Sequence, residues 1–304
     1  MSRKKAPPGG PEAIGIAGAG RVGQALGRLL RERGQPVVAI ASRDLGQAEA
    51  AAAFVGDAVR AVPYAGLPEH AGRILVAVPD TALRGVAETL AATGMKRGIV
   101  LHTCGARGPE ALAPLESAGV SCGTLHPLQT VASPEQGVRA LPGVAFGITA
   151  DGAAAGWAEQ IVALLGGQAL RIAPEARALY HAAAVMASNY VVGMIDAADT
   201  LMREAGVEAA VARRALAPLL RASVDNALSL GPAKALTGPI ERGDAETVAG
   251  HLHAMAAADG TPETVRALYR SAAWHLLAVA RRRGLSAEKA HEIDKLLRED
   301  EENV

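Results

Sequence analysis

Three glycines near the start of the chain have the spacing of a dinucleotide-binding turn. Gly18, Gly20 and Gly23 lie where a short apolar run meets a helix-like segment. The first glycine permits a tight turn, the second lets the backbone approach a pyrophosphate, and the third lets the helix close on the sheet. A helix amino terminus also favours an anion. The alternative is a glycine-rich turn without a ligand. We expect cofactor contacts from Gly18, Ala19, Gly20, Arg21, Val22 and Gly23.

The residues after the second apolar run indicate which dinucleotide would bind. A carboxylate at this position would bind the ribose 2′-hydroxyl of NAD. Ser42 and Arg43 stand near it instead, and a hydroxyl with a guanidinium suits the 2′-phosphate of NADP. NADP is therefore favoured over NAD, unless Asp44 turns toward the ribose. An ordinary polar turn is the alternative.

Polar residues also follow three later apolar runs, at the edge where open α/β sheets bind their ligands. Asp80 is better explained as a cap for the next helix than as a catalyst. His102 fits a structural role as well as a functional one. We expect cofactor contacts from Val78, Pro79 and Thr103, and substrate contacts from His126 and Gln129.

A second polar cluster lies in an alanine-rich segment that is predicted to form one long helix over residues 174–206. His181 and Ser188 would share a stripe of that helix, with Asn189 one residue further on. An imidazole titrates near neutral pH, so His181 is suited to protonate a carbonyl oxygen, and Asn189 is suited to hold it. The alternative is that these groups hydrogen-bond to neighbouring helices.

A sheet is needed to bring these residues to one edge. Up to about residue 172, short apolar runs alternate with helix-like stretches, which is typical of a doubly wound, Rossmann-like parallel sheet in an α/β protein. The predicted strands are residues 13–18, 36–42, 73–79, 98–104, 120–127 and 143–149. The predicted helices between them are residues 21–34, 45–56, 80–94 and 107–119.

The second half is predicted to be an all-α domain, because no good strand follows residue 173. After the long helix we expect helices over 208–231, 244–258, 261–284 and 286–300, with a kink or break at Pro218. Side chains suited to cap these helices are those of Asp244, Thr261 and Ser286. The predicted divisions are a disordered tail (1–11), a dinucleotide-binding domain (12–172) and a helical substrate and dimerisation domain (173–304).

Composition argues against several classes of partner. Lys plus Arg equals Asp plus Glu at 31 each, and aromatic residues are 3%, so neither nucleic acid nor an anionic membrane is expected. Two cysteines make no disulfide framework, which favours a reducing, cytoplasmic location. We expect no signal peptide and no apolar run near the ~20 residues that span a bilayer. No metal is expected, because His251 and His253 would not share a helix face.

Several motifs together resemble one family. GxGxxG, VPDTAL, HTCGA, HPLQT, YHAAAVMASNY and ALTGPIERGD, over about residues 12–285, are similar to motifs of Rossmann-like NADP-binding proteins with a C-terminal helical domain of formerly unassigned function. That group is related to pyrroline-5-carboxylate reductases, coenzyme-F420-dependent NADP reductases and β-hydroxyacid dehydrogenases, and PanG-type members are ketopantoate reductases. The resemblance implies that His181 replaces the relatives' lysine and that Asn189 matches their asparagine. It also implies a homodimer through the helical domains.

These observations give three hypotheses. The first is an NADPH-dependent reductase of a small oxo acid such as ketopantoate, with His181 and Asn189 catalytic. The second is an imine reductase of the pyrroline-5-carboxylate reductase type, and the third is a non-catalytic NADP-binding sensor or partner protein. The segment 235–244 is either a substrate-side loop or a structural turn. Substrate contacts are expected from His126, Gln129, Ser188, Asn226, Thr237 and Arg242.

Overall fold

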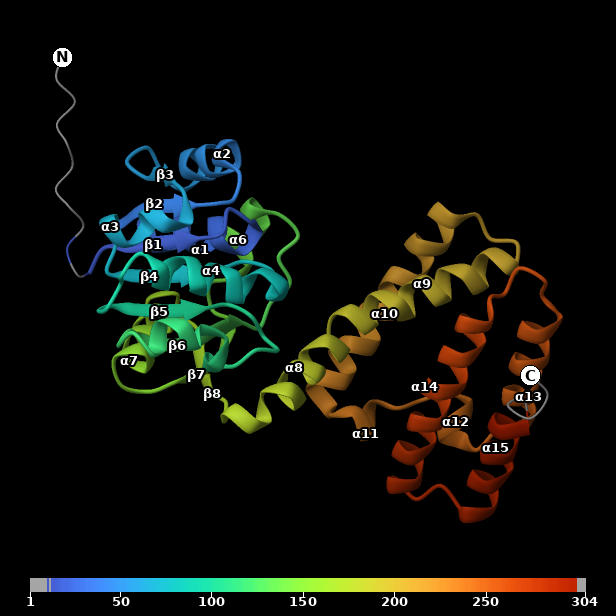
Figure 1. The fold of residues 1–304 in the computed structure, drawn as a ribbon. Coiled ribbons are helices and arrows are strands. Elements are labelled where there is room, and N and C mark those ends of the chain that lie inside the picture. The colour runs from blue at the N-terminus through green and yellow to red at the C-terminus, as the bar shows by residue number, and fades with distance from the viewer. Residues whose placement is uncertain (1–9, 11, 300–304) are drawn as a thin grey trace. The chain divides into compact units, whose positions relative to one another are not determined.

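The computed structural model describes residue 10 and residues 12–299, so the predicted tail of residues 1–11 lies outside the described residues apart from Gly10. The chain divides into two compact units, Met1–Ser188 and Asn189–Val304. Figure 1 shows that the first unit contains the sheet and that the second is helical. The proposed division between residues 172 and 173 follows the last strand, whereas the division by contacts comes one helix later.

The first unit is built on an eight-stranded sheet with the order β3-β2-β1-β4-β5-β6-β7-β8. The predicted α/β class with a doubly wound sheet is confirmed, but the sheet is not wholly parallel, because β7 runs antiparallel to β6. The segment between these two strands returns to the sheet edge that it left, so no crossover is made. The strands are β1 (Ile14–Ala17), β2 (Val37–Ala41), β3 (Arg60–Val62), β4 (Arg73–Val76), β5 (Ile99–His102), β6 (Ser121–Pro127), β7 (Ala145–Ala150) and β8 (Gln168–Arg171).

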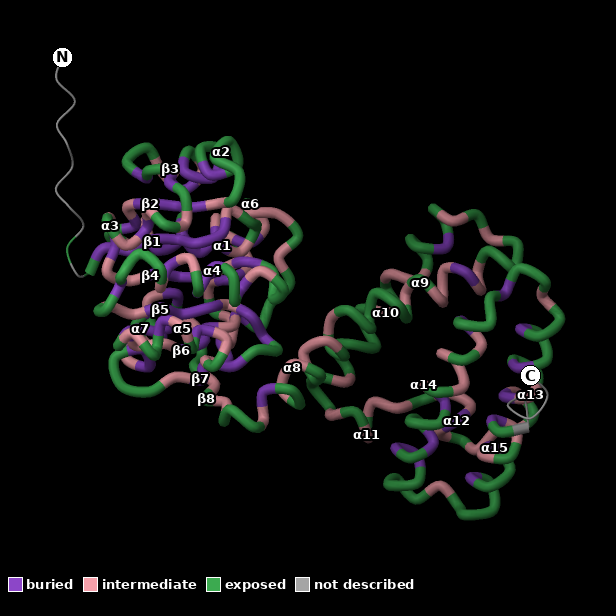
Figure 2. Tube along the Cα trace, viewed as in Figure 1, coloured by how far each residue is buried: buried purple, intermediate pink, exposed green. Residues whose placement is uncertain are grey.

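Helices cover both faces of the sheet and make two apolar cores. One core joins Ile16 to Leu26 and Trp157, and the other joins Ile74 to Leu83. Figure 2 shows the buried strands between the half-exposed helices. The helices are α1 (Arg21–Glu32), α2 (Leu45–Val55), α3 (Leu67–His70), α4 (Asp80–Ala92), α5 (Ala113–Glu116), α6 (Pro134–Ala140), α7 (Gly152–Leu164) and α8 (Arg177–Met186), with 3₁₀ turns at Tyr64–Gly66, Pro109–Leu112 and Pro174–Ala176.

The prediction of one long helix over 174–206 is wrong. The helix stops after α8 and starts again as α9 (Asn189–Glu204). At the interruption the Ser188 hydroxyl donates a 2.7 Å hydrogen bond to the Ala184 carbonyl oxygen, a back-bond that competes with regular helix geometry. His181 lies on α8, Asn189 begins α9, and Ser188 lies between the two helices, so the predicted stripe of His181 and Ser188 on one continuous helix is not formed.

The expectation of no membrane-length apolar segment also needs correction. By length and composition alone, Pro174–Glu204 is long and apolar enough to cross a bilayer. However, Arg177 near its start is buried at 2% exposure and donates hydrogen bonds to Thr124 and Thr149 of the sheet. A guanidinium anchored to a sheet is not what a lipid-embedded helix end requires. One such segment is by itself weak evidence for a membrane span.

The second unit is helical throughout its described residues. Pro218 lies inside α10 without ending it, so the predicted break does not occur. The core packs Val248, Leu252, Leu277 and Ile293 together. Besides α9, the helices are α10 (Ala209–Leu230), α11 (Pro232–Ala235), α12 (Pro239–Arg242), α13 (Ala245–Ala257), α14 (Glu263–Arg282) and α15 (Ala287–Glu299).

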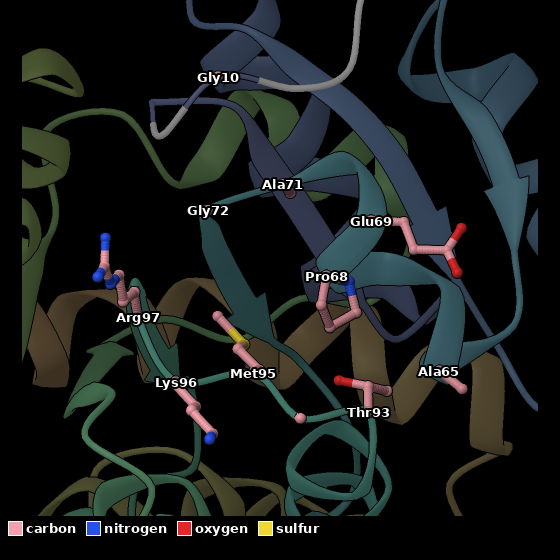
Figure 3. A pocket seen from close by; sticks show the side chains of 11 residues that line it. Gly10, Ala65, Pro68, Glu69, Ala71, Gly72, Thr93, Met95, Lys96 and Arg97 are labelled. Carbon is pink, nitrogen blue, oxygen red and sulfur yellow. The ribbon is translucent and has the colours of Figure 1, made fainter.

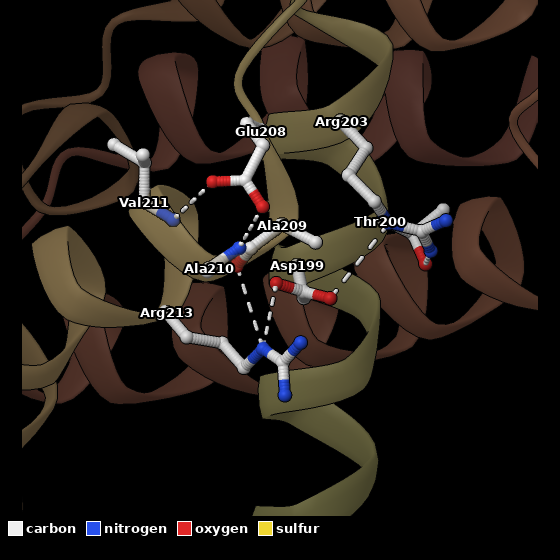
Figure 4. A network of polar contacts seen from close by, with 8 residues as sticks. All are labelled: Asp199, Thr200, Arg203, Glu208, Ala209, Ala210, Val211 and Arg213. Atoms are coloured by element: carbon white, nitrogen blue, oxygen red, sulfur yellow. Dashed lines mark hydrogen bonds and ion pairs between the residues drawn. The ribbon is translucent and has the colours of Figure 1, made fainter.

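Polar contacts fix the helix ends of this unit. Figure 4 shows Asp199 of α9 paired with Arg213 of α10, while the Glu208 carboxylate accepts hydrogen bonds at the start of α10. Asp244 caps α13 as predicted, by accepting from the Thr247 N–H. Thr261 does not cap α14, because Pro262 holds that position without a side-chain bond.

Candidate functional site

The glycine turn has the stereochemistry that a dinucleotide needs. Gly18 has φ +123°, and a Cβ there would lie 2.2 Å from the Ala77 carbonyl oxygen. A Cβ on Gly23 would lie 2.2 Å from the Gly18 oxygen, so both glycines are required by packing. Gly20 differs, because its φ is −79° and the nearest described atom to its Cβ would be 3.9 Å away. Packing does not explain Gly20, whereas an approaching pyrophosphate does.

This turn stands at the point where the strand order of the sheet reverses. β1 lies between β2 and β4, and such a switch point opens a crevice at the carboxyl ends of the strands. Gly20 is the N-cap of α1, so the first N–H groups of the helix point toward this crevice. Arg21 and Val22 follow in its first turn, and the Arg21 side chain donates to the Val131 carbonyl oxygen at 3.3 Å. Gln24 braces Ala19 by donating to its carbonyl oxygen at 2.8 Å.

The residues after β2 bear on the choice between NADP and NAD. Asp44 is the N-cap of α2, and its carboxylate accepts the Gln47 N–H at 2.9 Å. This use of the carboxylate argues against the NAD alternative. Ser42 follows β2 directly and Arg43 is exposed next to it, as the 2′-phosphate interpretation requires.

The loop after β5 is held by a structural histidine. His102 is fully buried, its Nδ1 accepts the Cys104 N–H at 3.2 Å, and its Nε2 donates to the Gly108 carbonyl oxygen at 2.9 Å. Burial lowers the pKa of His102 to about 4, so the ring is neutral. Both nitrogens are used, and the ring sets the path of Thr103 and Gly105 at the sheet edge.

The residues that follow β4 lie at the same edge of the sheet. Val78 is buried and Pro79 is the N-cap of α4. Asp80 does not cap this helix by a side-chain bond, contrary to expectation, but it occupies the first turn, where the helix dipole favours a carboxylate. Burial raises the pKa of the Cys104 thiol, which donates to the Val78 carbonyl oxygen, so this cysteine is no nucleophile.

A cluster of aromatic and imidazole side chains meets this edge from β6 and α8. The hydroxyl of Tyr180 lies 2.8 Å from His126 Nδ1, and their rings are edge to face. The His181 ring centre is 6.0 Å from that of His126. A Cβ on Gly105 would lie 2.4 Å from His181 Cδ2 and 2.8 Å from His126 Nε2. Gly105 thus makes room for both imidazoles.

Arg177 organises this cluster. Its guanidinium donates to Thr124 and Thr149 at 2.8 and 3.0 Å, and to the carbonyl oxygens of Cys104 and Gly105 at 2.9 and 2.8 Å. Within the described part of the chain it forms no ion pair with a carboxylate, and its Nε has no hydrogen bond. The chain therefore buries a positive charge beside the imidazoles, and burial lowers the pKa of Arg177.

Local sequence explains why these side chains converge. Arg177, Tyr180 and His181 have the i, i+3, i+4 spacing of one helix face. On the sheet, Thr124 and His126 alternate onto one face of β6, opposite Thr149 and Gly147 of β7. Neither Arg177, Tyr180, Gly105 nor Gly147 was predicted as a site residue, although the spacing in RALYH could have identified the helix face.

Two other predicted substrate residues, both in the first unit, make local contacts. Gln129 is exposed after β6, and its side chain accepts from the Thr130 N–H. Ser188 bonds back to its own helix. The remaining residues lie in the second unit, namely Asn189 at the start of α9, Asn226 on α10, Thr237 before α12 and Arg242 at the end of α12. Their substrate roles stay predictions.

The segment 235–244 has ample structural reasons for its sequence. Gly238 has φ +96° and Gly243 has φ +67°, conformations that favour glycine. The Leu236 carbonyl oxygen accepts from Arg283, and the Arg242 carbonyl oxygen accepts from Lys289. These contacts support the structural-turn alternative without testing the substrate-side one.

Cavities and metal ligands do not mark the site. Glu69, Lys96 and Arg97 line a cavity at the opposite, amino-terminal edge of the strands (Figure 3). Its volume is about 490 Å³. Another cavity, of about 400 Å³, lies within the helical unit. Among residues 10 and 12–299, no three His, Cys, Asp or Glu side chains gather as a metal site.

Two parts of the chain match known protein families. Residues 10–127 match a Rossmann-like domain, and residues 144–275 match a domain of unknown function, DUF2520. The order of these two matches agrees with the Rossmann-like domain and the C-terminal helical domain that the motifs indicate. Among curated proteins none matches the sequence.

Solved structures share this fold over most of the chain. A protein from Bacteroides fragilis, whose name proposes an NADP oxidoreductase, is 23% identical with a TM-score of 0.71, and 88% of this chain and 100% of that chain are covered. An imine reductase from Streptomyces aurantiacus is 16% identical with a TM-score of 0.61, covering 94% and 99%. A reductive aminase from Aspergillus terreus, in complex with NADPH and ethyl-5-oxohexanoate, is 17% identical with a TM-score of 0.60, covering 96% and 94%. At these identities the likeness shows the fold.

Proposed function

We propose that this chain is an NADPH-dependent oxidoreductase that reduces a small oxo acid. The observation that carries the proposal is Gly20, which has no packing reason to be glycine in a turn where Gly18 and Gly23 both do. The turn lies at the switch point of the sheet, the usual place of a dinucleotide. Ser42 and Arg43 suit the 2′-phosphate, and Val78, Pro79 and Thr103 line the same edge.

The bound cofactor would supply a hydride, and the chain would supply the proton. Two imidazoles flank Gly105 at this edge, those of His126 and His181. In this proposal either imidazole would protonate an oxygen that gains charge during reduction. The buried charge of Arg177 behind them favours an anionic substrate or a developing negative charge. A ketopantoate-like oxo acid has both a carbonyl oxygen to be protonated and a negative charge.

An imine reductase is the second candidate. The structures from Streptomyces aurantiacus and Aspergillus terreus that share the fold are named as an imine reductase and a reductive aminase. An imidazole that protonates oxygen can equally hand a proton to an imine nitrogen. A non-catalytic NADP-binding protein remains the third candidate, because binding at the glycine turn does not require the histidines.

We also propose a cytoplasmic homodimer formed through the helical unit. Val192, Leu219 and Leu228 expose 67%, 64% and 81% of their surface on α9 and α10. Large exposed apolar patches mark interfaces, and a second copy of the chain is the occupant that the resemblance implies. Analytical ultracentrifugation should find twice the monomer mass, and Leu228→Glu should shift the chain toward monomer. Monomeric wild-type protein would contradict this.

The test of the function is NADPH oxidation followed by absorbance, with a panel of oxo acids including ketopantoate and a panel of cyclic imines. Gly20→Ala should fold normally and bind NADPH roughly tenfold or more weakly, because its Cβ would occupy the space left for the pyrophosphate. Gly85→Ala on α4 is the matched control, since nothing lies near that Cβ. Wild-type protein that binds NADPH but reduces none of these compounds would contradict the enzymatic proposal.

A further inference from the structure

The contact between Tyr180 and His126 depends on a glycine on the neighbouring strand. His126 is fixed by the strand β6, and Tyr180 reaches it from α8. Opposite His126 on β7 is Gly147, where a Cβ would lie 2.5 Å from the Tyr180 hydroxyl oxygen. Any larger residue at this position would displace the tyrosine from the histidine. The chain therefore makes space for this hydroxyl as well as for the two imidazoles.

The bond between them defines which nitrogen of His126 faces outward. A tyrosine hydroxyl normally donates, and a neutral imidazole accepts on one nitrogen and carries its proton on the other. Burial, followed by the nearby His181 and Arg177, lowers the pKa of His126 to about 4, so the ring is neutral near pH 7. With Nδ1 accepting from Tyr180, the proton is on Nε2, which is the nitrogen next to Gly105.

A neutral imidazole alone is a poor acid. It can hydrogen-bond to a carbonyl oxygen, but it gives up its Nε2 proton only if Nδ1 gains another at the same time. The Tyr180 hydroxyl is the group that can provide it. Arg177 would stabilise the negative charge of the Tyr180 phenolate that results. Its guanidinium carbon is 5.9 Å from the Tyr180 ring centre, and no carboxylate in the described residues pairs with it.

Resting on the proposed reductase function, we propose that Tyr180 and His126 form a proton relay that delivers the proton to the substrate oxygen or nitrogen. The Nε2–H bond of His126 breaks as the substrate O–H or N–H bond forms. The Tyr180 O–H bond breaks as the Nδ1–H bond forms, so the negative charge moves from the substrate to the phenolate. Solvent then returns one proton to Nε2, and the Nδ1 proton returns to the phenolate oxygen.

The groups around the relay act on the pKa of both Tyr180 and His126. Burial raises the pKa of Tyr180, while Arg177 and a backbone hydrogen bond from Gly147 act to lower it. Those two groups would hold a phenolate formed during turnover. Around His126 stand His181 and Arg177 of α8, Asp80 of α4 and His102 of β5, of which only Asp80 favours the imidazolium. His126 is thus the donor that touches substrate, and Tyr180 acts through it.

The kinetic test compares Tyr180→Phe with Tyr269→Phe. Tyr269 bonds to His251 between α13 and α14 of the helical unit, so its variant loses a similar hydroxyl from a pair outside the proposed relay. Tyr180→Phe should lower kcat roughly 100-fold at pH 7, with NADPH affinity unchanged, and its kcat should rise as the pH falls toward 4, because His126 must then be charged to act as an acid. Tyr269→Phe should keep the wild-type rate.

A spectroscopic test needs no substrate or cofactor. Nitrogen-15 NMR of the imidazoles, with His126 assigned through its Asn variant, should show the Nε2–H form at pH 7 in the wild type and a mixture of both forms in Tyr180→Phe. The Nδ1–H form in the wild type overturns the relay. An active wild type whose Tyr180→Phe variant loses nothing, or loses the same factor at every pH, also overturns it. A wild type that reduces no compound overturns the proposed function instead.

Discussion

Among the described residues, two tyrosine–histidine pairs have nearly the same geometry, one in each compact unit. The Tyr180 hydroxyl lies 2.8 Å from His126 Nδ1, and the Tyr269 hydroxyl lies 2.9 Å from His251 Nδ1. Their rings cross at 89° and 87°. The bond itself is therefore not what distinguishes a candidate active site.

The surroundings of the two pairs differ. His126 is half-buried at the carboxyl edge of a sheet, against Gly105, where a Cβ would crowd its outer nitrogen, and beside a buried guanidinium. His251 is exposed on α13, at an apolar cavity of the helical unit. We infer that the surroundings of such a pair, rather than the bond itself, decide whether it can transfer a proton.

The largest expected effect comes from removing the imidazole of His126, with His251 as the matched control. His126→Asn should lower kcat roughly 100- to 10,000-fold, the usual range for general acid–base groups, because the outer N–H is lost. His251→Asn should stay within about twofold of the wild type, since His251 is an exposed residue of α13 and is not part of the proposed relay. Steady-state kinetics with the best substrate of the panel measures both. Equal losses in the two variants would break the comparison.

A smaller effect is expected from the glycines beside the imidazoles. Gly105→Ala should lower kcat about 10-fold, because the new Cβ would push His126 and His181 apart. Gly250 is next to His251 inside α13, with open space around its Cβ, so Gly250→Ala should instead stabilise the helix by about 0.5–1 kcal/mol. Kinetics and thermal unfolding separate these outcomes. Full activity in Gly105→Ala would mean that the imidazoles need no such space.

The smallest effect is on the pH dependence of stability. The pKa of His126 is about 4 in the folded chain, against an ordinary 6.5, so between these values the unfolded chain binds more protons. The contribution is complete above about pH 6.5 and is lost as the pH falls toward 4. Urea unfolding at pH 7 and 4.5 should show that the wild type loses about 1–2 kcal/mol more than His126→Asn. Equal losses of unfolding free energy in the wild type and in His126→Asn would mean that burial does not lower the pKa of His126.

Much of the fold could be predicted from local patterns. The central strands and the glycine turn are encoded by short apolar runs and by glycines whose spacing has a steric cause, as at Gly18 and Gly23. β3 and β8 were missed because each has only three or four residues and is partly exposed. The reversed direction of β7 depends on where the preceding segment packs, which periodicity does not encode.

The candidate site was harder to predict for the same reason. The contact of His126 with Tyr180 joins residues 54 positions apart, and nothing local in either segment specifies it. Arg177 looks like an ordinary surface arginine in the sequence, and only the sheet residues that it meets explain its burial. The long helix was overestimated because a back-bonding serine leaves the apolar pattern unbroken.

The measurement that tests the central claim most directly is a crystal structure of the chain with NADP⁺ bound. The account predicts the pyrophosphate over Gly20, the 2′-phosphate at Ser42 and Arg43, and the nicotinamide ring beside Gly105, facing His126 Nε2. A nicotinamide directed away from His126, or a glycine turn that binds no dinucleotide, would contradict it.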